Sequence, residues 1–275
     1  MAFVQAGQVR LEYFDVGYDG RTMVLVHGAS SSARIWHMVQ ERMAEAGVRT
    51  VAIGMRGAGG SDHTPNREDY NPAAYARDLA AALNALSVKR FALVGHSLGV
   101  ATAIHFMRDH AADFEVQALV LMAGGDARGR PLPTPEQMRE LEETVDCPPA
   151  DDEGTRRARW KPNHLGLPPD IRDDLWRDIQ NNPKERVLGQ RLCERPDMTA
   201  VLATLTVPTL VMSGDADGTV PLEATLRSFL SLPLEHRHLH GFHGVSHFPN
   251  AHVPDQVADV LHLFIDAHVP ILESP

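Results

Sequence analysis

Ser97 lies between two glycines in the sequence Gly95-His96-Ser97-Leu98-Gly99. The apolar residues 91–94 before it have the character of a buried strand, and residues 100–107 after it have the pattern of a helix. At such a junction, Gly-x-Ser-x-Gly predicts a tight turn that strains the serine backbone, with glycines on both sides to prevent collisions between strand and helix. The hydroxyl is then exposed at the C-terminal edge of a sheet, where α/β sheets bind ligands. The predicted chemistry is nucleophilic attack by Ser97.

A serine hydroxyl is a poor nucleophile at neutral pH and needs a neighbouring base, usually an imidazole held by a carboxylate. Asp217 comes just after the apolar run 208–212, and His247 lies in the last long loop of the chain. Both residues can therefore reach the sheet edge at which Ser97 is expected. The sequence predicts a catalytic triad of Ser97, Asp217 and His247, in this chain order.

Three other residues compete for the acid and base positions. Asp215 stands two positions before Asp217, and Asp126 follows the preceding predicted strand. His243 precedes His247 in the same loop. The distance of Asp217 from its strand and the local sequence around His247 favour these two residues over their competitors.

We expect no metal ion and no cofactor. His236, His238 and His240 alternate and could share one face of a strand, but no further ligand at zinc-site spacing follows. Residues 215–218 resemble the start of a calcium loop but lack its third acidic position and its terminal glutamate. The glycine-rich segment 54–62 is neither a G-x-G-x-x-G pattern nor a P-loop, which argues against a nucleotide site.

The elements that position these residues alternate between strands and helices. Continuous apolar runs predict buried parallel strands at 23–26, 48–53, 91–94, 118–122 and 208–212. Helical spacing predicts helices over 35–46, 72–86, 136–145, 170–179, 222–230 and 254–267. A looser pattern predicts an antiparallel edge strand over 9–16 and another strand near 234–239. We expect an α/β fold, with a mostly parallel central sheet and helices on both faces.

The segment 128–200 differs in composition from the rest of the chain. It contains more than half of the 19 prolines, together with both cysteines and two tryptophans, and it has no strand pattern. Because its apolar content is too high for a disordered linker, it predicts an inserted helical cap, here called the cap segment. The core is then formed by residues 1–127 and 201–275. Trp160, His164 and Trp176 either line a substrate pocket or hold the cap together, and His96 is interpreted as a packing residue behind the serine.

The overall composition excludes several classes of partner. A chain of 275 residues with 43% hydrophobic residues can bury a sizeable core. Its net charge of -10 argues against nucleic acid or an anionic membrane surface, which leaves a small-molecule substrate as the expected partner. Cys147 and Cys193 have no C-x-x-C spacing, and the chain shows neither a signal pattern nor a membrane-spanning run. We expect a cytoplasmic protein.

Five segments, in this order, resemble the α/β-hydrolase family of capped esterases, lactonases and C–C hydrolases: Val26-His27-Gly28-Ala29, Arg56-Gly57-Ala58-Gly59-Gly60-Ser61, Gly95-His96-Ser97-Leu98-Gly99, Pro208–Val211 with Gly214–Asp217, and Ser246-His247-Phe248-Pro249. The resemblance covers nearly the whole core. It implies that Ser97 is the nucleophile, Asp217 the acid and His247 the base. It also implies an oxyanion hole formed by the backbone N–H groups of Ala29 and Leu98. The sequence departs from the family at Gly54, where an aspartate usually anchors the glycine-rich loop.

Together these features predict a cofactor-independent serine hydrolase that cleaves a carboxylic ester or lactone of a small apolar molecule through an acyl-enzyme intermediate. One alternative is a C–C bond hydrolase of diketones that uses the same triad. Another is a ligand receptor of the same fold with very slow turnover. The substrate stays open, because specificity depends on the cap segment.

Overall fold

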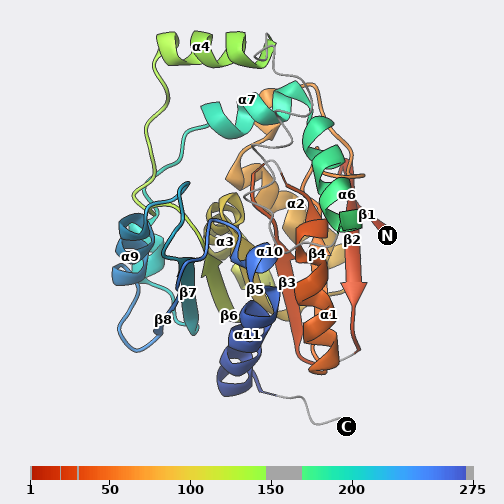
Figure 1. Cartoon of the computed structure of the whole chain (residues 1–275), viewed down its shortest axis with the longest axis vertical. Helices are drawn as coiled ribbons and strands as arrows, with labels where there is room; N and C mark the ends of the chain where they lie inside the picture. The colour runs from red at the N-terminus through yellow and green to blue at the C-terminus, as the bar shows by residue number, and fades with distance from the viewer. Residues whose placement is uncertain (1, 19, 30, 147–168, 271–275) are drawn as a thin grey trace.

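The computed structural model describes residues 2–18, 20–29, 31–146 and 169–270. Its centre is an eight-stranded sheet in the order β1-β2-β4-β3-β5-β6-β7-β8 (Figure 1). The pairs β1–β2 and β2–β4 are antiparallel, and all other pairs are parallel. The predicted mostly parallel sheet is therefore confirmed. The strands are β1 (Ala2–Ala6), β2 (Val9–Val16), β3 (Thr22–Val26), β4 (Arg49–Ile53), β5 (Arg90–His96), β6 (Glu115–Met122), β7 (Thr209–Gly214) and β8 (Arg237–Phe242).

Helices cover both faces of this sheet, as predicted (Figure 1). Residues of α2 and α3 pack in one buried cluster, and residues of α1 and α11 pack in the other. The α-helices are α1 (His37–Glu45), α2 (Pro72–Ala85), α3 (Leu98–Asp109), α4 (Pro135–Asp146), α6 (Pro169–Gln180), α7 (Lys184–Leu192), α8 (Thr199–Ala203), α9 (Leu222–Leu230), α10 (Pro249–His252) and α11 (Pro254–His268). The short 3-10 helices are η1 (Ala33–Trp36), η2 (Arg67–Asp69) and η3 (Ala111–Asp113).

The central strand β3 shows why the two layers form. All five of its residues are buried. Because successive side chains of a strand point to opposite faces, Val24 and Val26 join the cluster with α2 and α3, while Met23 and Leu25 join the cluster with α1 and α11. A continuous apolar run is therefore what a strand covered on both faces requires.

Two sequence predictions about the sheet are wrong in detail. Residues 9–16 form β2, but β2 is not the edge strand, because β1 pairs with its residues 9–13. Only two side chains of β1 are buried, so its five residues give a weak pattern. The strand expected near 234–239 is β8, which begins at Arg237 and is largely unburied, so that no apolar run marks it.

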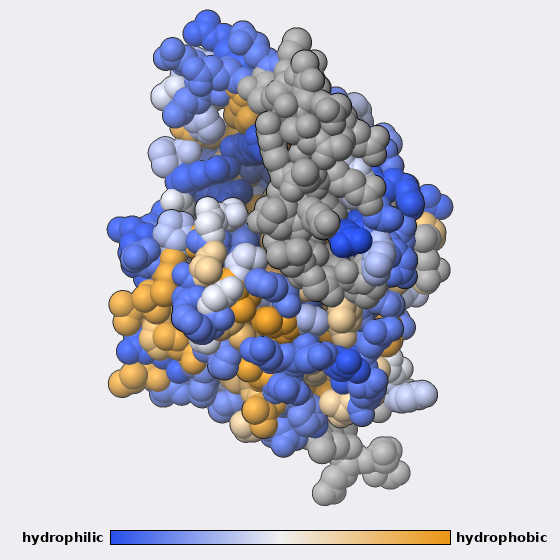
Figure 2. Space-filling view, viewed as in Figure 1, coloured by the Kyte–Doolittle hydropathy of each residue, from blue (hydrophilic) through white to orange (hydrophobic). Residues whose placement is uncertain are grey.

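The cap segment contributes α4, α6 and α7 between β6 and β7, and two of these helices match the predicted ranges 136–145 and 170–179. Trp160, His164 and Cys147 lie outside the described residues. Figure 2 shows a mainly hydrophilic surface over α4 and apolar residues gathered near α9, where Leu230 and Leu234 are exposed. Among the described residues, no helix has the length and apolar character needed to cross a bilayer.

Candidate active site

The turn around Ser97 has the strained geometry that its sequence predicts. Ser97 has a φ of 54° and a ψ of -115°, a region that non-glycine residues rarely occupy. A Cβ atom on Gly95 would lie 2.3 Å from the carbonyl oxygen of Gly99, and one on Gly99 would lie 2.5 Å from that of Val26. The two glycines therefore allow β5 and α3 to approach closely, and the serine is held at the start of α3.

The structure brings Ser97, Asp217 and His247 together. Nδ1 of His247 lies 2.8 Å from Oδ2 of Asp217, and Nε2 lies 2.9 Å from Oγ of Ser97. Because a carboxylate only accepts, the imidazole proton is assigned to Nδ1, which leaves Nε2 free to accept from the serine hydroxyl. The Asp217 and His247 side chains are 1% and 7% exposed. This arrangement can activate a serine hydroxyl for nucleophilic attack.

The ends of β7 and β8 position the carboxylate and the imidazole. The pairing of β7 with β8 continues into the loops that follow them. There the backbone N–H of Ala216 donates to the carbonyl of Val245. A Cβ atom on Gly214 would lie 2.0 Å from that same carbonyl oxygen, so only glycine permits this approach. The two loops are therefore held side by side, and Asp217 faces His247 across them.

Asp217 is held as an ionised acceptor. Burial by itself raises the pKa of its carboxyl, but the hydrogen bonds from His247 and from the backbone N–H groups of Val220 and Thr219 outweigh burial and lower that pKa below its usual value. The two backbone bonds to Oδ1 measure 2.9 and 2.7 Å. A charged Asp217 can orient the His247 ring and stabilise its protonated form.

The competing residues occupy other positions. Asp215 and His243 pair with each other, with 2.8 Å between Oδ2 and Nδ1, and His243 is fully exposed. Asp126 accepts hydrogen bonds from Arg128 and Arg227. None of these three side chains contacts Ser97 in the described structure, so the geometry agrees with the preference for Asp217 and His247.

The backbone N–H groups of Ala29 and Leu98, the predicted oxyanion donors, belong to residues that lie beside Ser97. Leu98 is the first residue of α3 and Ala29 follows β3, and both line the cavity that contains Ser97. Neither N–H has a hydrogen-bond acceptor within the described residues. Gly28 makes their approach possible, because a Cβ there would lie 2.9 Å from the Cβ of Ser97.

His27 fixes the peptide that precedes Ala29. Its Nε2 accepts from the backbone N–H of Met55 at 3.0 Å, so Nδ1 carries the proton and donates to the carbonyl of Gly28 at 2.8 Å. Burial and, to a smaller extent, the nearby charge of Arg186 lower the pKa of His27 to about 3. The ring is therefore neutral at physiological pH. From the sequence, His27 is predicted only as part of a motif, and its hydrogen bonds with Met55 and Gly28 are not.

Glu12 anchors the glycine-rich loop in place of the missing aspartate at Gly54. Its buried carboxylate accepts from the backbone N–H of Gly60 at 3.0 Å and from Arg34 at 2.8 Å. The hydroxyl of Ser61 accepts from the backbone N–H of Glu12 and donates to the carbonyl of Gly54. Nothing in the sequence of β2 indicates this role, since the two partners lie 48 positions apart.

The cap segment also holds the loop that follows Ala29. Arg186 on α7 is buried and donates to the backbone carbonyl of Ser31 at 3.0 Å. Arg34 on η1 lies 3.4 Å from the Asp178 carboxylate on α6. Two cap helices therefore contact the segment that carries one of the candidate oxyanion donors.

His96 packs behind the serine, as the sequence analysis proposed. Its Nε2 lies 2.8 Å from the backbone carbonyl of His247, and its ring lies 5.2 Å from the His247 ring. The three alternating histidines of the β8 region do not form a metal centre, because no group of three potential ligands gathers within the described ranges. His238 instead packs against Phe264 and His268.

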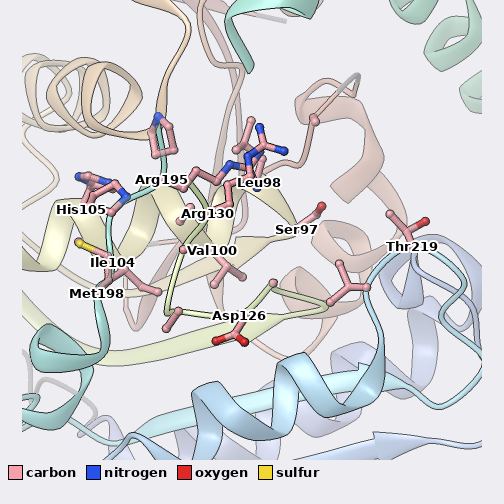
Figure 3. A pocket seen from close by; sticks show the side chains of 18 residues that line it. Ser97, Leu98, Val100, Ile104, His105, Asp126, Arg130, Arg195, Met198 and Thr219 are labelled. Atoms are coloured by element: carbon pink, nitrogen blue, oxygen red, sulfur yellow. The ribbon is translucent and has the colours of Figure 1, made fainter. Parts of the chain in front are cut away.

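The cavity at Ser97 has a volume of about 340 Å³, which suits a small molecule (Figure 3). One wall is the apolar face of α3 with Val100, Ala101 and Ile104, and Arg130 and Arg195 also line the cavity. Trp176, a candidate pocket residue, is buried and is not among the described residues that line this cavity.

A family model described as the alpha/beta hydrolase fold matches residues 21–250. The chain belongs to the alpha/beta hydrolase fold family. The 2-hydroxy-6-oxononadienedioate/2-hydroxy-6-oxononatrienedioate hydrolase of Burkholderia vietnamiensis is 29% identical over 85% of this chain and 84% of its own length. The N-formylmaleamate deformylase of Pseudomonas putida is 30% identical over 60% of this chain and 61% of its own.

The solved structure of a thermophilic esterase from Thermogutta terrifontis has a TM-score of 0.79 to this alpha/beta hydrolase, at 23% identity, and covers 97% of this chain and 98% of its own. At that identity the likeness concerns the fold alone. The family and its hydrolase relatives make this protein an enzyme of the hydrolase class.

Proposed function

We propose that this enzyme is a serine hydrolase that cleaves a carboxylic ester or lactone of a small molecule through an acyl-enzyme intermediate. The single observation that carries the proposal is the buried His247 ring, which bridges the Ser97 hydroxyl and the Asp217 carboxylate at 2.9 and 2.8 Å. Such a bridge is the arrangement that converts a weak hydroxyl nucleophile into a reactive one.

In the first half of the reaction, Nε2 of His247 takes the proton of Ser97 while Oγ attacks the substrate carbonyl carbon. The N–H groups of Ala29 and Leu98 donate to the negative oxygen that develops, and Asp217 stabilises the protonated imidazole. His247 then returns the proton to the leaving alkoxide, and the carbon–oxygen bond breaks. The acyl group stays on Ser97.

In the second half, a water molecule gives a proton to His247 and attacks the acyl carbon. The same two N–H groups hold the second oxyanion. Collapse of this intermediate breaks the bond to Oγ, and His247 returns the proton to Ser97, which releases the carboxylic acid. The Ser97 hydroxyl and the neutral His247 ring are thereby restored. No cofactor takes part in any of these steps.

A C–C bond hydrolase is the second candidate function, because the Burkholderia relative, whose name describes an oxo dioate substrate, covers 85% of this chain. The triad would serve both reactions. Parallel assays with simple esters, lactones and a vinylogous diketone separate them, since turnover of the diketone alone would favour the second candidate.

The experiment that tests the proposal combines a serine-directed phosphonate probe with steady-state turnover. We expect the probe to label the wild type and not Ser97→Ala, and ester or lactone turnover to fall by about 10⁴- to 10⁶-fold in that variant. Ser231→Ala, which removes a hydroxyl at the end of α9, is the matched control and retains both. Equal labelling of Ser97→Ala contradicts the proposal, and stoichiometric product without turnover points to a receptor.

A further inference from the structure

Arg130 and Arg195 stand opposite each other at the base of the cap segment. Their backbones form an antiparallel bridge in which each N–H donates to the other carbonyl, at 2.8 and 3.2 Å. Residues paired in this way direct their side chains to the same face. Gly129 makes the close approach possible, because a Cβ there would lie 1.9 Å from the carbonyl oxygen of Arg195.

Both arginines line the cavity into which Ser97 opens. Figure 3 shows their side chains on the cavity side that also contains Leu98, between His105 and Ser97. The apolar face of α3 runs along the same cavity from Leu98 to His105. At a rise of about 1.5 Å per residue, this face is on the order of 10 Å long. The cavity therefore combines a reactive hydroxyl, an apolar wall and two cations.

The two guanidinium groups donate hydrogen bonds to backbone carbonyls. Arg130 donates to the backbone carbonyls of Gln190 and Arg191 at the end of α7, at 3.2 and 2.5 Å, and Arg195 donates to that of Gln190 at 3.3 Å. Nε of Arg195 is buried without a hydrogen-bond partner. Within the described residues, none of the side-chain partners of these two arginines is a carboxylate.

Two other partly buried arginines of this protein do have carboxylate partners. Arg34 is paired with Glu12, and Arg56 forms two hydrogen bonds with Asp78. Burial and the charge of Arg195 lower the pKa of Arg130, and they outweigh the opposite, smaller effect of the neighbouring Cys193 side chain. Asp126 also lines the cavity, but Arg128 and Arg227 occupy its carboxylate. Two adjacent guanidinium groups without a carboxylate partner can bind an anion.

We propose that Arg130 and Arg195 bind a carboxylate group of the substrate, so that the enzyme acts on acidic esters or lactones whose carboxylate is separated from the reacting carbonyl by an apolar chain. This inference rests on the proposed serine hydrolase function and names its substrate class. A planar carboxylate can accept two hydrogen bonds from a guanidinium fork, whereas the net charge of -10 gives the rest of the protein no general attraction for anions.

The test compares monomethyl and dimethyl esters of glutarate, adipate and pimelate, which share a carbon chain and differ in one free carboxylate. We expect the wild type to prefer the monomethyl ester of at least one acid in kcat/KM. Arg195→Gln should reduce this preference by about 10- to 100-fold, as the loss of a charge-assisted hydrogen bond implies. Arg195→Lys retains the charge without the planar fork and should recover part of the preference.

Arg90→Gln is the matched control, because it removes one positive charge at the opposite end of β5, where Arg90 pairs with Glu115. It should retain the preference for the monomethyl ester. An equal loss of activity toward both esters in Arg195→Gln, together with a lower Tm, would show that the pair only stabilises the end of α7 and would overturn the inference. A wild type that hydrolyses both kinds of ester without the preference would also overturn it.

Calorimetric binding of the same monomethyl esters to Ser97→Ala separates the two proposals. If the wild type hydrolyses no ester, the proposed ester chemistry fails, but binding to Ser97→Ala that weakens by about 10- to 100-fold in Ser97→Ala/Arg195→Gln still supports the carboxylate site. If none of the three monomethyl esters binds to Ser97→Ala, the carboxylate site is wrong, whatever the wild type hydrolyses.

Discussion

Two aspartate–histidine pairs lie on the same two loops and differ mainly in their surroundings. Asp217 and His247 are 2.8 Å apart and 30 positions apart in the chain, and Asp215 and His243 are 2.8 Å apart and 28 positions apart. The side chains of the first pair are 1% and 7% exposed, whereas those of the second are 42% and 100% exposed. Only His247 reaches the Ser97 hydroxyl.

A hydrogen-bonded carboxylate and imidazole therefore do not by themselves make a site. Between exposed groups, water and salt screen the attraction, so such a pair contributes little to stability. Between buried groups, the same contact fixes the orientation and the proton of the ring, because no water competes for either. The buried pair also faces a third group that can react, and the exposed pair does not.

The largest difference is expected for the two histidines. His247→Ala should lower kcat/KM by about 10⁴- to 10⁶-fold, because it removes the base that is hydrogen-bonded to Ser97. His243→Ala should change kcat/KM less than about twofold, in line with a solvated surface residue. Steady-state assays of both variants, with far-UV circular dichroism to verify folding, measure the difference. A large loss in His243→Ala would reverse the assignment of the base.

The aspartates should differ in the same direction by a smaller factor. Asp217→Asn retains the shape of the side chain but no longer stabilises the His247 proton on Nδ1, so we expect a loss of about 10⁴-fold in kcat. Asp215→Asn should leave kcat nearly unchanged. The matched pair is measured with one substrate at saturation. Similar rates for the two variants would mean that the buried carboxylate does not act through the imidazole.

The sequence predicted the parts of this site that local geometry determines. The turn at Ser97 needs Gly95 and Gly99 within two positions of the serine, and the motif therefore carries the whole steric requirement. The strands of the central sheet were equally visible, because burial on both faces demands continuous apolar runs such as residues 23–26.

Contacts between distant segments could not be predicted. Glu12 holds a loop 48 positions away, and the side chain of Arg130 reaches a carbonyl 60 positions away. Neither residue stands in a recognisable local pattern, and in both of these distant contacts the partner is a backbone group, which any sequence supplies. For the same reason, the sequence offered two aspartates and two histidines for the acid and base positions. Only the fold decides which residues of the two loops face each other.

A further difference between the pairs is that His96 supports the buried one. Its Nε2–H donates to the backbone carbonyl of His247. Loss of this bond in His96→Phe should lower kcat by about 5- to 100-fold and leave KM nearly unchanged, because a displaced base impairs the reaction more than it impairs binding. His96→Gln retains an N–H donor and should recover part of kcat. A change confined to KM would contradict this positioning role.

The smallest expected effect concerns the response of the two pairs to salt and acid. Hydrogen bonds from His243 and Gly244 lower the pKa of Asp215, and Asp217 also has a lowered pKa, as described above. A carboxyl whose pKa is lower in the folded state stabilises the protein above its unfolded pKa of about 4, and this stabilisation is lost as the pH falls through the folded value. The stability difference between the wild type and either Asn variant should therefore shrink below about pH 4.

Salt should separate the pairs at about pH 5, where an exposed imidazole ordinarily carries a positive charge. Urea unfolding in 0.05 and 1 M NaCl should show that the difference between the wild type and Asp215→Asn falls toward zero at high salt, because a fully exposed imidazole faces the solvent ions. The difference for Asp217→Asn should persist, since its pair is shielded from those ions. In a His243→Ala background the salt response of Asp215→Asn should disappear. If both differences respond equally to salt, burial does not distinguish the two pairs in solution, and the contrast drawn between them fails.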